Sequence, residues 1–197
     1  MAKPLDQQAL DTLFTEARSF SYWQGRPVSD EQLHQLYELM KMGPTAVNSC
    51  PARMVFIKSD EAKQRLKPSL AEGNVDKCMS APVVAIISWD SEFYTKLNRL
   101  FPHAADARSW YEGKPEKIES IASMNSTLQT AYLIMAARSL GLDCGPMTGF
   151  DNAVLDKEFF ADGIYKSSIL CAIGYGVKEK LHPRGARLDF DEVCKVL

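Results

Sequence analysis

Apolar residues recur at helical spacing near the start of the chain. They stand three or four positions apart over residues 5–17, and the same pattern returns over residues 33–40. Ser29-Asp30-Glu31-Gln32 offers a capping box before the second run, because the serine hydroxyl can accept a hydrogen bond from the amide three residues on. Gly43-Pro44-Thr45 ends that run, since proline cannot continue a helix and glycine tolerates the left-handed geometry of a helix end. The pattern predicts two amphipathic helices and then an ordered loop as far as Pro51.

Three other segments, residues 54–57, 83–89 and 169–174, are apolar at successive positions and rich in β-forming side chains. Such runs are typical of strands that are buried on both faces of a sheet. Residues 91–111, by contrast, mix aromatic and charged side chains without one clear period. We expect this stretch to be an excursion from the core.

The longest helical pattern runs from about Ile118 to Leu140. Its second half, residues 131–137, is apolar on all sides, and such a helix needs cover all round. It can be the hub of a single core or pack against its own copy in a dimer, and the pattern favours neither. Asn125, Ser126 and Gln129 lie on the same helix and need hydrogen-bond partners if they are buried.

The overall composition limits the class of protein. The chain has 197 residues, of which 46% are hydrophobic, so we expect one domain over residues 1–197 with a core that needs no disulfides or metals. The net charge is -2 without a block of Lys and Arg, so nucleic acid is not an expected partner. The first residues lack a signal-peptide core and no apolar run approaches the ~20 residues that span a bilayer, which predicts a cytoplasmic protein without membrane contact.

Several chemistries lack their sequence signature. The cysteines form no Cys-x-x-Cys pair and the histidines lie far apart, so neither a disulfide framework nor a metal site is expected. We interpret the cysteines as reduced, mostly buried thiols. A Gly-x-Ser-x-Gly elbow is absent, which disfavours a hydrolase. Gly174-Tyr175-Gly176 follows a predicted strand but lacks the third glycine of a dinucleotide-binding fold.

Short segments that are far apart in the chain carry a family resemblance. They are Arg18-Ser19, the loop Pro44-Thr45-Ala46-Val47-Asn48-Ser49-Cys50-Pro51, the segment Gly73-Asn74-Val75-Asp76-Lys77, the segment Pro146-Met147-Thr148-Gly149, and the pair Arg184 and Arg187. Together they resemble the nitroreductase-like family of FMN-dependent flavoproteins over nearly the whole chain. The likeness is greatest to its malonic semialdehyde reductase branch, the 3-hydroxypropanoate dehydrogenases associated with pyrimidine breakdown.

The resemblance implies a fold and an activity. The fold would be α/β (α+β), with a nitroreductase-like mixed sheet flanked by helices and the long helix at a dimer interface. The protein would be a homodimer with two flavin sites between the subunits, FMN as cofactor and NADH or NADPH as co-substrate. Hydride would pass from the nicotinamide to flavin N5 and then, in a second half-reaction, to a small acceptor, so turnover would be ping-pong. The branch implies malonic semialdehyde as that acceptor.

The resemblance also implies roles for individual residues. A guanidinium binds phosphate through paired charge-assisted hydrogen bonds, which suits Arg18 and Arg187 to the FMN phosphate. Lys77 would stabilise the negative charge that gathers toward flavin N1 and O2 on reduction. The loop of residues 44–51 would reach the flavin from the neighbouring subunit. The implied cofactor-binding residues are Arg18, Ser19, Phe20, Pro44, Thr45, Asn48, Asn74, Lys77, Pro146, Met147, Gly149, Arg184 and Arg187.

Two positions depart from the family pattern. Cys50 stands where the loop usually has glutamine, and Thr148 stands where many members have glutamate, so both roles are open in this chain. No side chain is assigned to proton transfer, because the flavin carries the hydride. Arg108 is a candidate for binding the acceptor's carboxylate. Alternatively, its segment is a surface excursion whose Trp110 and Tyr111 fill a groove in the dimer.

Two other functions fit the same residues. One is a broad-specificity nitro or quinone reductase for which the semialdehyde is incidental, and kcat/KM for the two kinds of acceptor distinguishes it. The other is a non-catalytic flavin-binding or ligand-sensing dimer, which the departures at Cys50 and Thr148 favour. Bleaching of the bound flavin by NAD(P)H without oxygen would indicate the enzyme.

Overall fold

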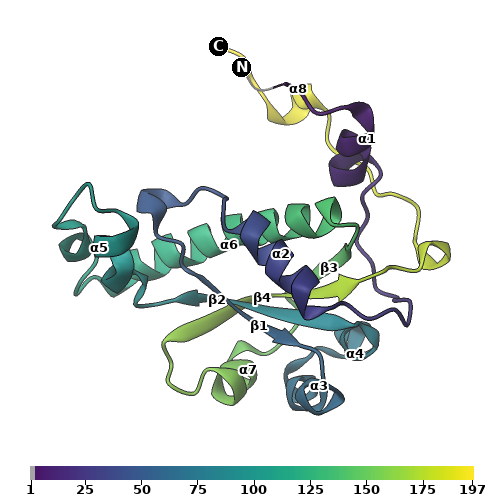
Figure 1. The fold of residues 1–197 in the computed structure, drawn as a ribbon, viewed down its shortest axis with the longest axis horizontal. Helices are drawn as coiled ribbons and strands as arrows, with labels where there is room; N and C mark the ends of the chain where they lie inside the picture. The colour runs from purple at the N-terminus through teal and green to yellow at the C-terminus, as the bar shows by residue number, and fades with distance from the viewer. Residues whose placement is uncertain (1–2) are drawn as a thin grey trace.

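One sheet separates two layers of helices in the computed structural model, which describes residues 3–197 (Figure 1). The strand order is β1-β2-β4-β3, and all pairings between these strands are antiparallel. An isolated bridge that joins Ser19 to Cys144 of β3 is parallel, and the mixed character of the sheet is limited to it. The fold class predicted for the chain, a sheet flanked by helices, is confirmed. The strands are β1 Ala52–Ile57, β2 Val83–Asp90, β3 Asp143–Met147 and β4 Tyr165–Gly174.

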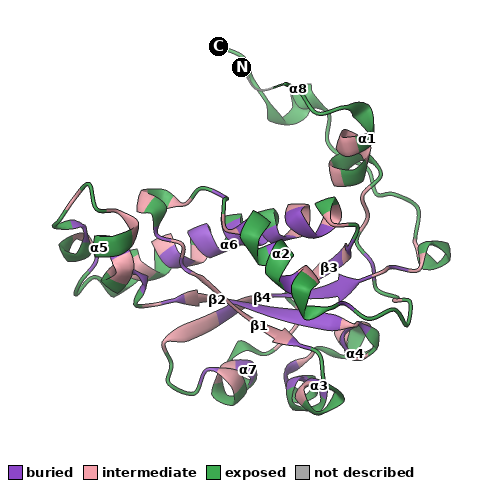
Figure 2. Cartoon of the chain, viewed as in Figure 1, coloured by how far each residue is buried: buried purple, intermediate pink, exposed green. Residues whose placement is uncertain are grey.

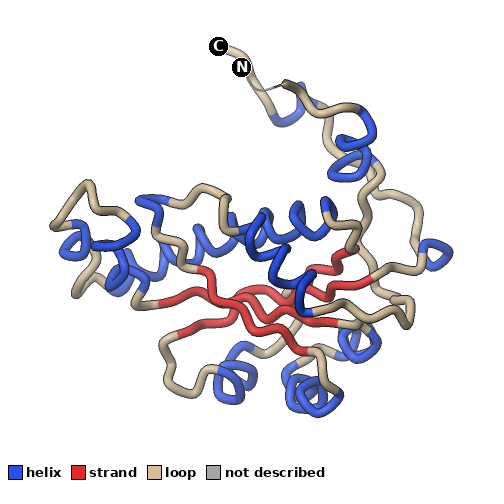
Figure 3. The backbone as a smooth tube through the Cα atoms, viewed as in Figure 1, coloured by secondary structure: helices blue, strands red, loops and turns tan. Residues whose placement is uncertain are grey.

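Helices cover both faces of the sheet (Figure 3). α2 and α6 lie on one face, and α3, α4 and α7 lie on the other (Figure 1). α1 continues into a π-helix, Asp11–Thr15, and stands with α8 away from the sheet. The helices are α1 Gln7–Leu10, α2 Asp30–Met40, α3 Asp60–Leu66, α4 Glu72–Ser80, α5 Leu97–Leu100, α6 Pro115–Ser139, α7 Asn152–Phe159 and α8 Phe190–Val193.

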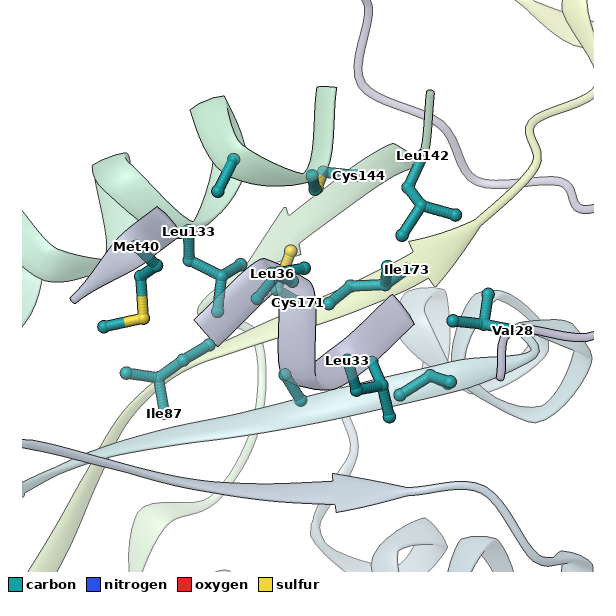
Figure 4. Packing of buried hydrophobic residues seen from close by; sticks show 14 residues of the cluster. Val28, Leu33, Leu36, Met40, Ile87, Leu133, Leu142, Cys144, Cys171 and Ile173 are labelled. Carbon is teal, nitrogen blue, oxygen red and sulfur yellow. The ribbon is translucent and has the colours of Figure 1, made fainter. Parts of the chain in front are cut away.

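The inner strand β2 is buried on both sides because its side chains alternate between two apolar clusters. Val83, Ala85 and Ile87 belong to the cluster under α2 and α6, together with Leu36 and Leu133 (Figure 4). The residues between them belong to the cluster that α3, α4 and α7 close on the opposite face. The prediction of strands buried on both faces is therefore confirmed for β2. Burial of each of its valine and isoleucine side chains stabilises the fold by about 1.5–3 kcal/mol.

The two ends of α2 show one prediction confirmed and one that was wrong. The Ser29 hydroxyl accepts from the Gln32 amide at 3.2 Å and the Gln32 side chain accepts from the Ser29 amide at 3.1 Å, which is the predicted capping box. Gly43, however, is not left-handed. A Cβ at this position would lie 2.5 Å from the Tyr132 ring. Glycine is needed there because α6 passes so close, and not because of the turn.

α6 is a core helix on one side and an uncovered apolar surface on the other. Leu133 and Ala136 are buried against the sheet. Met124, Leu128 and Tyr132 stand four residues apart and are exposed. Figure 2 shows that α6 has exposed as well as buried segments. The interpretation of this helix as the hub of the core is confirmed. It also leaves exposed apolar side chains, and packing against a second copy of the chain stays a prediction.

β3 and the short helices α3, α4 and α7 were not predicted. β3 contains Gly145 and Pro146, which are disfavoured in strands, and it forms at the edge of the sheet where proline is tolerated. The first predicted helix exists but is interrupted, because only residues 7–10 are α-helical before the π-helix. Leu5 and Phe14 are each 55% exposed, so the apolar face of this helix is not buried within the chain.

The expected excursion at residues 91–111 has a small core of its own. Phe93, Leu97 and Tyr111 are buried together and pack on Ala122 of α6. Tyr111 therefore fills a space inside its own chain. Across residues 3–197, none of the helices combines the length and the apolar character that crossing a membrane requires.

Candidate functional site

Four arginines from distant parts of the chain gather around one hollow. Arg18 follows the π-helix, Arg138 lies in the last turn of α6, and Arg184 and Arg187 come from the C-terminal segment. The hollow has a volume of about 220 Å³ and adjoins a larger cavity of about 830 Å³ between the N-terminal helix and the end of α6. Arg138 was not among the residues that the family resemblance singled out. The only sequence feature that could have pointed to it is its position directly after the apolar residues 131–137.

The guanidiniums of this cluster are not neutralised by the protein. Ion pairs found within residues 3–197 all involve other side chains. Arg18 donates to the carbonyl of His182, and Arg184 donates to the Thr15 carbonyl at 2.6 Å. Arg187 bonds only to carbonyls of its own segment among the described contacts. Like charges gathered without a carboxylate favour an anion between them.

Arg138 carries the clearest sign of a missing partner. Its Nη1 donates to the Leu13 carbonyl at 2.8 Å, but its Nε is buried without a hydrogen-bond acceptor. Leaving a buried donor unsatisfied costs about 1–3 kcal/mol. A phosphate in the hollow would accept hydrogen bonds from the guanidiniums that line it, Arg138 among them. The residues present therefore fit a phosphate-bearing ligand.

Asn74 and Lys77 of α4 contact the end of β3 and the segment after it. Asn74 Nδ2 donates to the Gly149 carbonyl at 2.9 Å, and Lys77 Nζ donates to the Pro146 carbonyl at 3.3 Å. A Cβ at Gly149 would lie 2.6 Å from Asn74 Nδ2, so the glycine makes room for that amide. The side chain of Met147 instead lies in the core, where its sulfur is 3.5 Å from Cys78 Sγ. Only the backbone of Met147 is available to a ligand.

Gly145 lies between Lys77 and Phe20, the second residue after Arg18. A Cβ on this residue would lie 2.2 Å from the carbonyl oxygen of Phe20 and 2.5 Å from Lys77 Cε. The Phe20 amide also donates to the Cys144 carbonyl at 3.0 Å, which fixes the segment after Arg18 along β3. Burial lowers the pKa of the Lys77 ammonium, and nearby Cys171 and Cys78 oppose that shift. The structure thus brings Arg18, Phe20 and Lys77 to one edge of the sheet.

The loop of residues 44–51 lies at the other end of the sheet. It leads into Ala52, which pairs with Trp89 near the end of β2, whereas α4 leads into the start of β2 at Val83. β2 has 8 residues, so the two ends are separated by roughly 25 Å. Within one chain, Pro44, Thr45 and Asn48 are therefore not brought together with Arg18 or Lys77.

This loop has an unusual backbone that α6 holds in place. Val47, Asn48 and Cys50 have φ values of 48°, 49° and 41°, in the left-handed region that costs side-chain-bearing residues energy. Asn125 Oδ1 accepts from the Ala46 amide at 2.7 Å, and Gln129 Oε1 accepts from the Ala52 amide at 2.9 Å. The buried amides of α6 thus have the partners that they need. They fix both ends of the loop.

The side chains of the loop face the excursion. Asn48 is exposed, and its Nδ2 donates to the Leu100 carbonyl of α5 at 2.8 Å. The Cys50 amide donates to Thr45 Oγ1 at 3.1 Å, and its thiol is 3.5 Å from Asn48 Oδ1. Ser49 is buried and its hydroxyl has no partner among the described residues. Cys50, which stands where the family usually has glutamine, thus contacts Thr45 and Asn48 within the loop.

The remaining predicted residues are at the surface or in the core. Arg108 forms an exposed ion pair with Glu112 at 2.7 Å. Thr148 is exposed beside Gly149. The expectation of mostly buried thiols is confirmed, since Cys78, Cys144 and Cys171 are buried, and burial raises the pKa of Cys78 to about 11. Groups of three or more His, Cys, Asp or Glu able to hold a metal do not occur in the described part of the chain.

Comparison with known proteins gives concordant matches. The profile of the "Nitroreductase family" matches residues 15–176. A Stutzerimonas stutzeri (strain A1501) protein named "Putative NADH dehydrogenase/NAD(P)H nitroreductase" is 54% identical over 194 residues, 98% of each chain. A protein of that name from Rhodopseudomonas palustris (strain TIE-1) is 54% identical over 197 residues, 100% of each chain. The solved structure of a "putative nitroreductase in complex with FMN" from Exiguobacterium sibiricum 255-15 has the same fold, with a TM-score of 0.86, 20% identity and 100% of both chains covered.

Proposed function

The chain belongs to the nitroreductase family, and from that premise we propose that it is an FMN-dependent NAD(P)H oxidoreductase that reduces a small acceptor. The observation that carries the proposal is the cluster of four arginines in which the buried Arg138 Nε lacks a partner. FMN, when bound, supplies hydride transfer from NADH or NADPH to the acceptor. The relatives named NAD(P)H nitroreductase and the fold neighbour in complex with FMN support the same assignment.

The residues of this chain would hold the cofactor at its two ends. The guanidiniums of Arg18, Arg138 and Arg184, with Arg187 at the rim, would bind the phosphate. The backbone of residues 146–149 and the Asn74 amide would lie along the flavin, joined to the phosphate end through Gly145. The Lys77 ammonium adds a positive charge at the same edge of the sheet. Pre-organised placement of this kind is the main contribution of the protein to flavin chemistry.

We also propose that the enzyme is a homodimer in which each site uses two chains. Within one chain, the loop of residues 44–51 and α4 lead into opposite ends of β2. The exposed stripe of Met124, Leu128 and Tyr132 on α6 offers an apolar surface for a symmetric contact. A two-fold contact there would let the loop of one chain approach the cofactor residues of the other.

Anaerobic reduction tests the proposed function directly. The purified protein should take up FMN, and NADH or NADPH added without oxygen should bleach the bound flavin within seconds. A protein that stays colourless after incubation with FMN would overturn the proposal. A yellow protein whose spectrum neither nicotinamide changes would instead be a flavin-binding or ligand-sensing dimer.

Lys77→Met is expected to lower the midpoint potential of the bound flavin. Loss of the ammonium removes positive charge that stabilises the more electron-rich state. For a two-electron couple a loss of about 1.4 kcal/mol corresponds to about 30 mV, and we expect a shift of this size or up to twice as large. The potential is measured by equilibrium dye titration, with the exposed Lys67→Met as control. A midpoint potential equal to that of the wild type would show that Lys77 does not stabilise the reduced flavin.

We propose malonic semialdehyde as the acceptor, with Arg108 binding its carboxylate. The second candidate is a broad-specificity nitro or quinone reductase, and the relatives named NAD(P)H nitroreductase favour a nitro compound as its acceptor. Arg108→Ala should lower kcat/KM at least tenfold for the semialdehyde and leave a neutral quinone unchanged, because one charge-assisted hydrogen bond is worth about 1.5–3 kcal/mol. Arg65→Ala, which breaks another exposed ion pair, is the matched control. Equal losses on both acceptors would exclude Arg108 as the carboxylate ligand.

A further inference from the structure

Asp90 is a carboxylate with no exposed side-chain surface at the end of β2. Its side chain is 0% exposed and accepts hydrogen bonds from Arg53 Nη2 at 2.5 Å and Lys96 Nζ at 2.8 Å. Its other oxygen accepts from the Glu92 amide at 2.8 Å. Both oxygens of the Asp90 carboxylate therefore have hydrogen-bond partners within the chain.

Arg53 connects this carboxylate to the loop of residues 44–51. Its Nη1 donates to the carbonyls of Cys50 at 2.9 Å and Ala52 at 2.8 Å, while its Nη2 faces Asp90. The Asp90 amide also donates to the Pro51 carbonyl at 3.0 Å. The guanidinium thus holds the last left-handed residue of the loop, Cys50, against the end of β2.

Lys96 extends the same network to the excursion. It belongs to the turn of 3-10 helix Phe93–Lys96, directly before α5. A second link runs from Asn48 Nδ2 to the Leu100 carbonyl at the end of α5. The loop and the excursion are therefore fixed to each other at two points, and Asp90 is common to both segments.

A buried ion cluster is weak support for a purely stabilising role. Removing charges from water offsets most of their mutual attraction, so an apolar side chain of similar size often gives equal stability. What the cluster does provide is a fixed orientation of the Arg53 side chain, because the planar guanidinium donates hydrogen bonds in set directions. Two of these hydrogen bonds go to carbonyls at the end of the strained loop. A strained backbone persists only where its surroundings enforce it.

We propose that Asp90 and Arg53 are positioning residues, which hold the loop of residues 44–51 in its left-handed conformation so that Asn48 is placed for the cofactor site of a second copy of this chain. This inference rests on the proposed function, since the flavin is the ligand that the loop would meet. Neither residue touches the cofactor in this arrangement. They act through the hydrogen bonds that the Arg53 guanidinium donates to the carbonyls of Cys50 and Ala52.

Arg53→Lys tests the proposal with little disturbance of charge. The ammonium can still face Asp90, but it has no second nitrogen to reach the Cys50 carbonyl. The dissociation constant for FMN should rise about tenfold, the scale of one lost charge-assisted hydrogen bond. The visible circular dichroism of the bound flavin should change, and amide hydrogen exchange of residues 45–50 in the flavin-free protein should become faster. Arg65→Lys, in an ion pair on α3, is the matched control.

The outcomes separate this inference from the proposed function. Wild-type protein that binds no FMN at all would remove the proposed function. If the wild type binds FMN and Arg53→Lys binds it equally well with an unchanged dichroism spectrum, the positioning role is wrong, even if exchange in the loop is faster. Should Arg53→Lys melt far below Arg65→Lys, Asp90→Asn provides the second test. A folded Asp90→Asn with wild-type affinity, or a failure of both variants to fold, would overturn positioning in favour of a purely structural role.

Discussion

Arg18→Ala is expected to weaken FMN binding about a hundredfold and to leave riboflavin binding nearly unchanged. The two ligands differ only in the phosphate, so the comparison isolates the arginine cluster from the rest of the site. One guanidinium that donates two charge-assisted hydrogen bonds accounts for a loss of this size. Titration of the apoprotein, followed by flavin fluorescence, measures both affinities.

Arg138→Ala should behave in the same way, because its unpaired Nε points to a contact that the protein alone does not make. The control is Arg65, which forms an exposed ion pair with Glu158. Arg65→Ala should leave the affinities for FMN and for riboflavin at the wild-type values. Equal losses of FMN and riboflavin affinity in the arginine variants would mean that the cluster supports the fold and not the phosphate. Unchanged affinity for both ligands would place the phosphate elsewhere.

Local signals were enough to predict the parts of the fold that depend on neighbours in sequence. The capping box of Ser29 and Gln32 and the apolar run of β2 involve residues within a few positions of one another, and both are confirmed. β3 could not be predicted in this way. Gly145 and Pro146 disfavour a strand locally, and the strand forms because β4 offers it an edge and Lys77 needs the space that Gly145 leaves.

The residues of the candidate site show the same contrast between local sequence signals and contacts with distant residues. Motif resemblance singled out Arg18, Asn74 and Lys77, which the structure places along one edge of the sheet. Arg138 and Asp90 were missed because no motif contains them. Their importance comes from burial and from partners far away in sequence, such as Leu13 for Arg138. Such contacts join residues that are far apart in the sequence, so no short motif records them.

The separation of the two half-sites explains how a small domain can build a flavin site without a nucleotide-binding fold. One end of the sheet carries the arginines and Lys77, and the opposite end carries a rigid, strained loop held by Asn125, Gln129 and Arg53. In the proposed symmetric dimer, each cofactor would meet one end of one chain and the opposite end of the other. This would increase the protein surface available to the cofactor without lengthening the chain.

Mixed dimers provide the sharpest consequence of that arrangement. Arg18→Ala removes a phosphate contact from the body of one chain, and Asn48→Ala alters the loop that would serve the other chain. In a heterodimer of the two variants, one site combines both defects and the second combines an intact body with an intact loop. Co-expression with two different affinity tags isolates this heterodimer. We expect it to bind about one FMN with wild-type affinity per dimer and to show about half of the wild-type activity, whereas each variant homodimer binds FMN weakly at both sites. If both residues served the same site within one chain, every site of the heterodimer would carry a defect, and no tight site would be recovered.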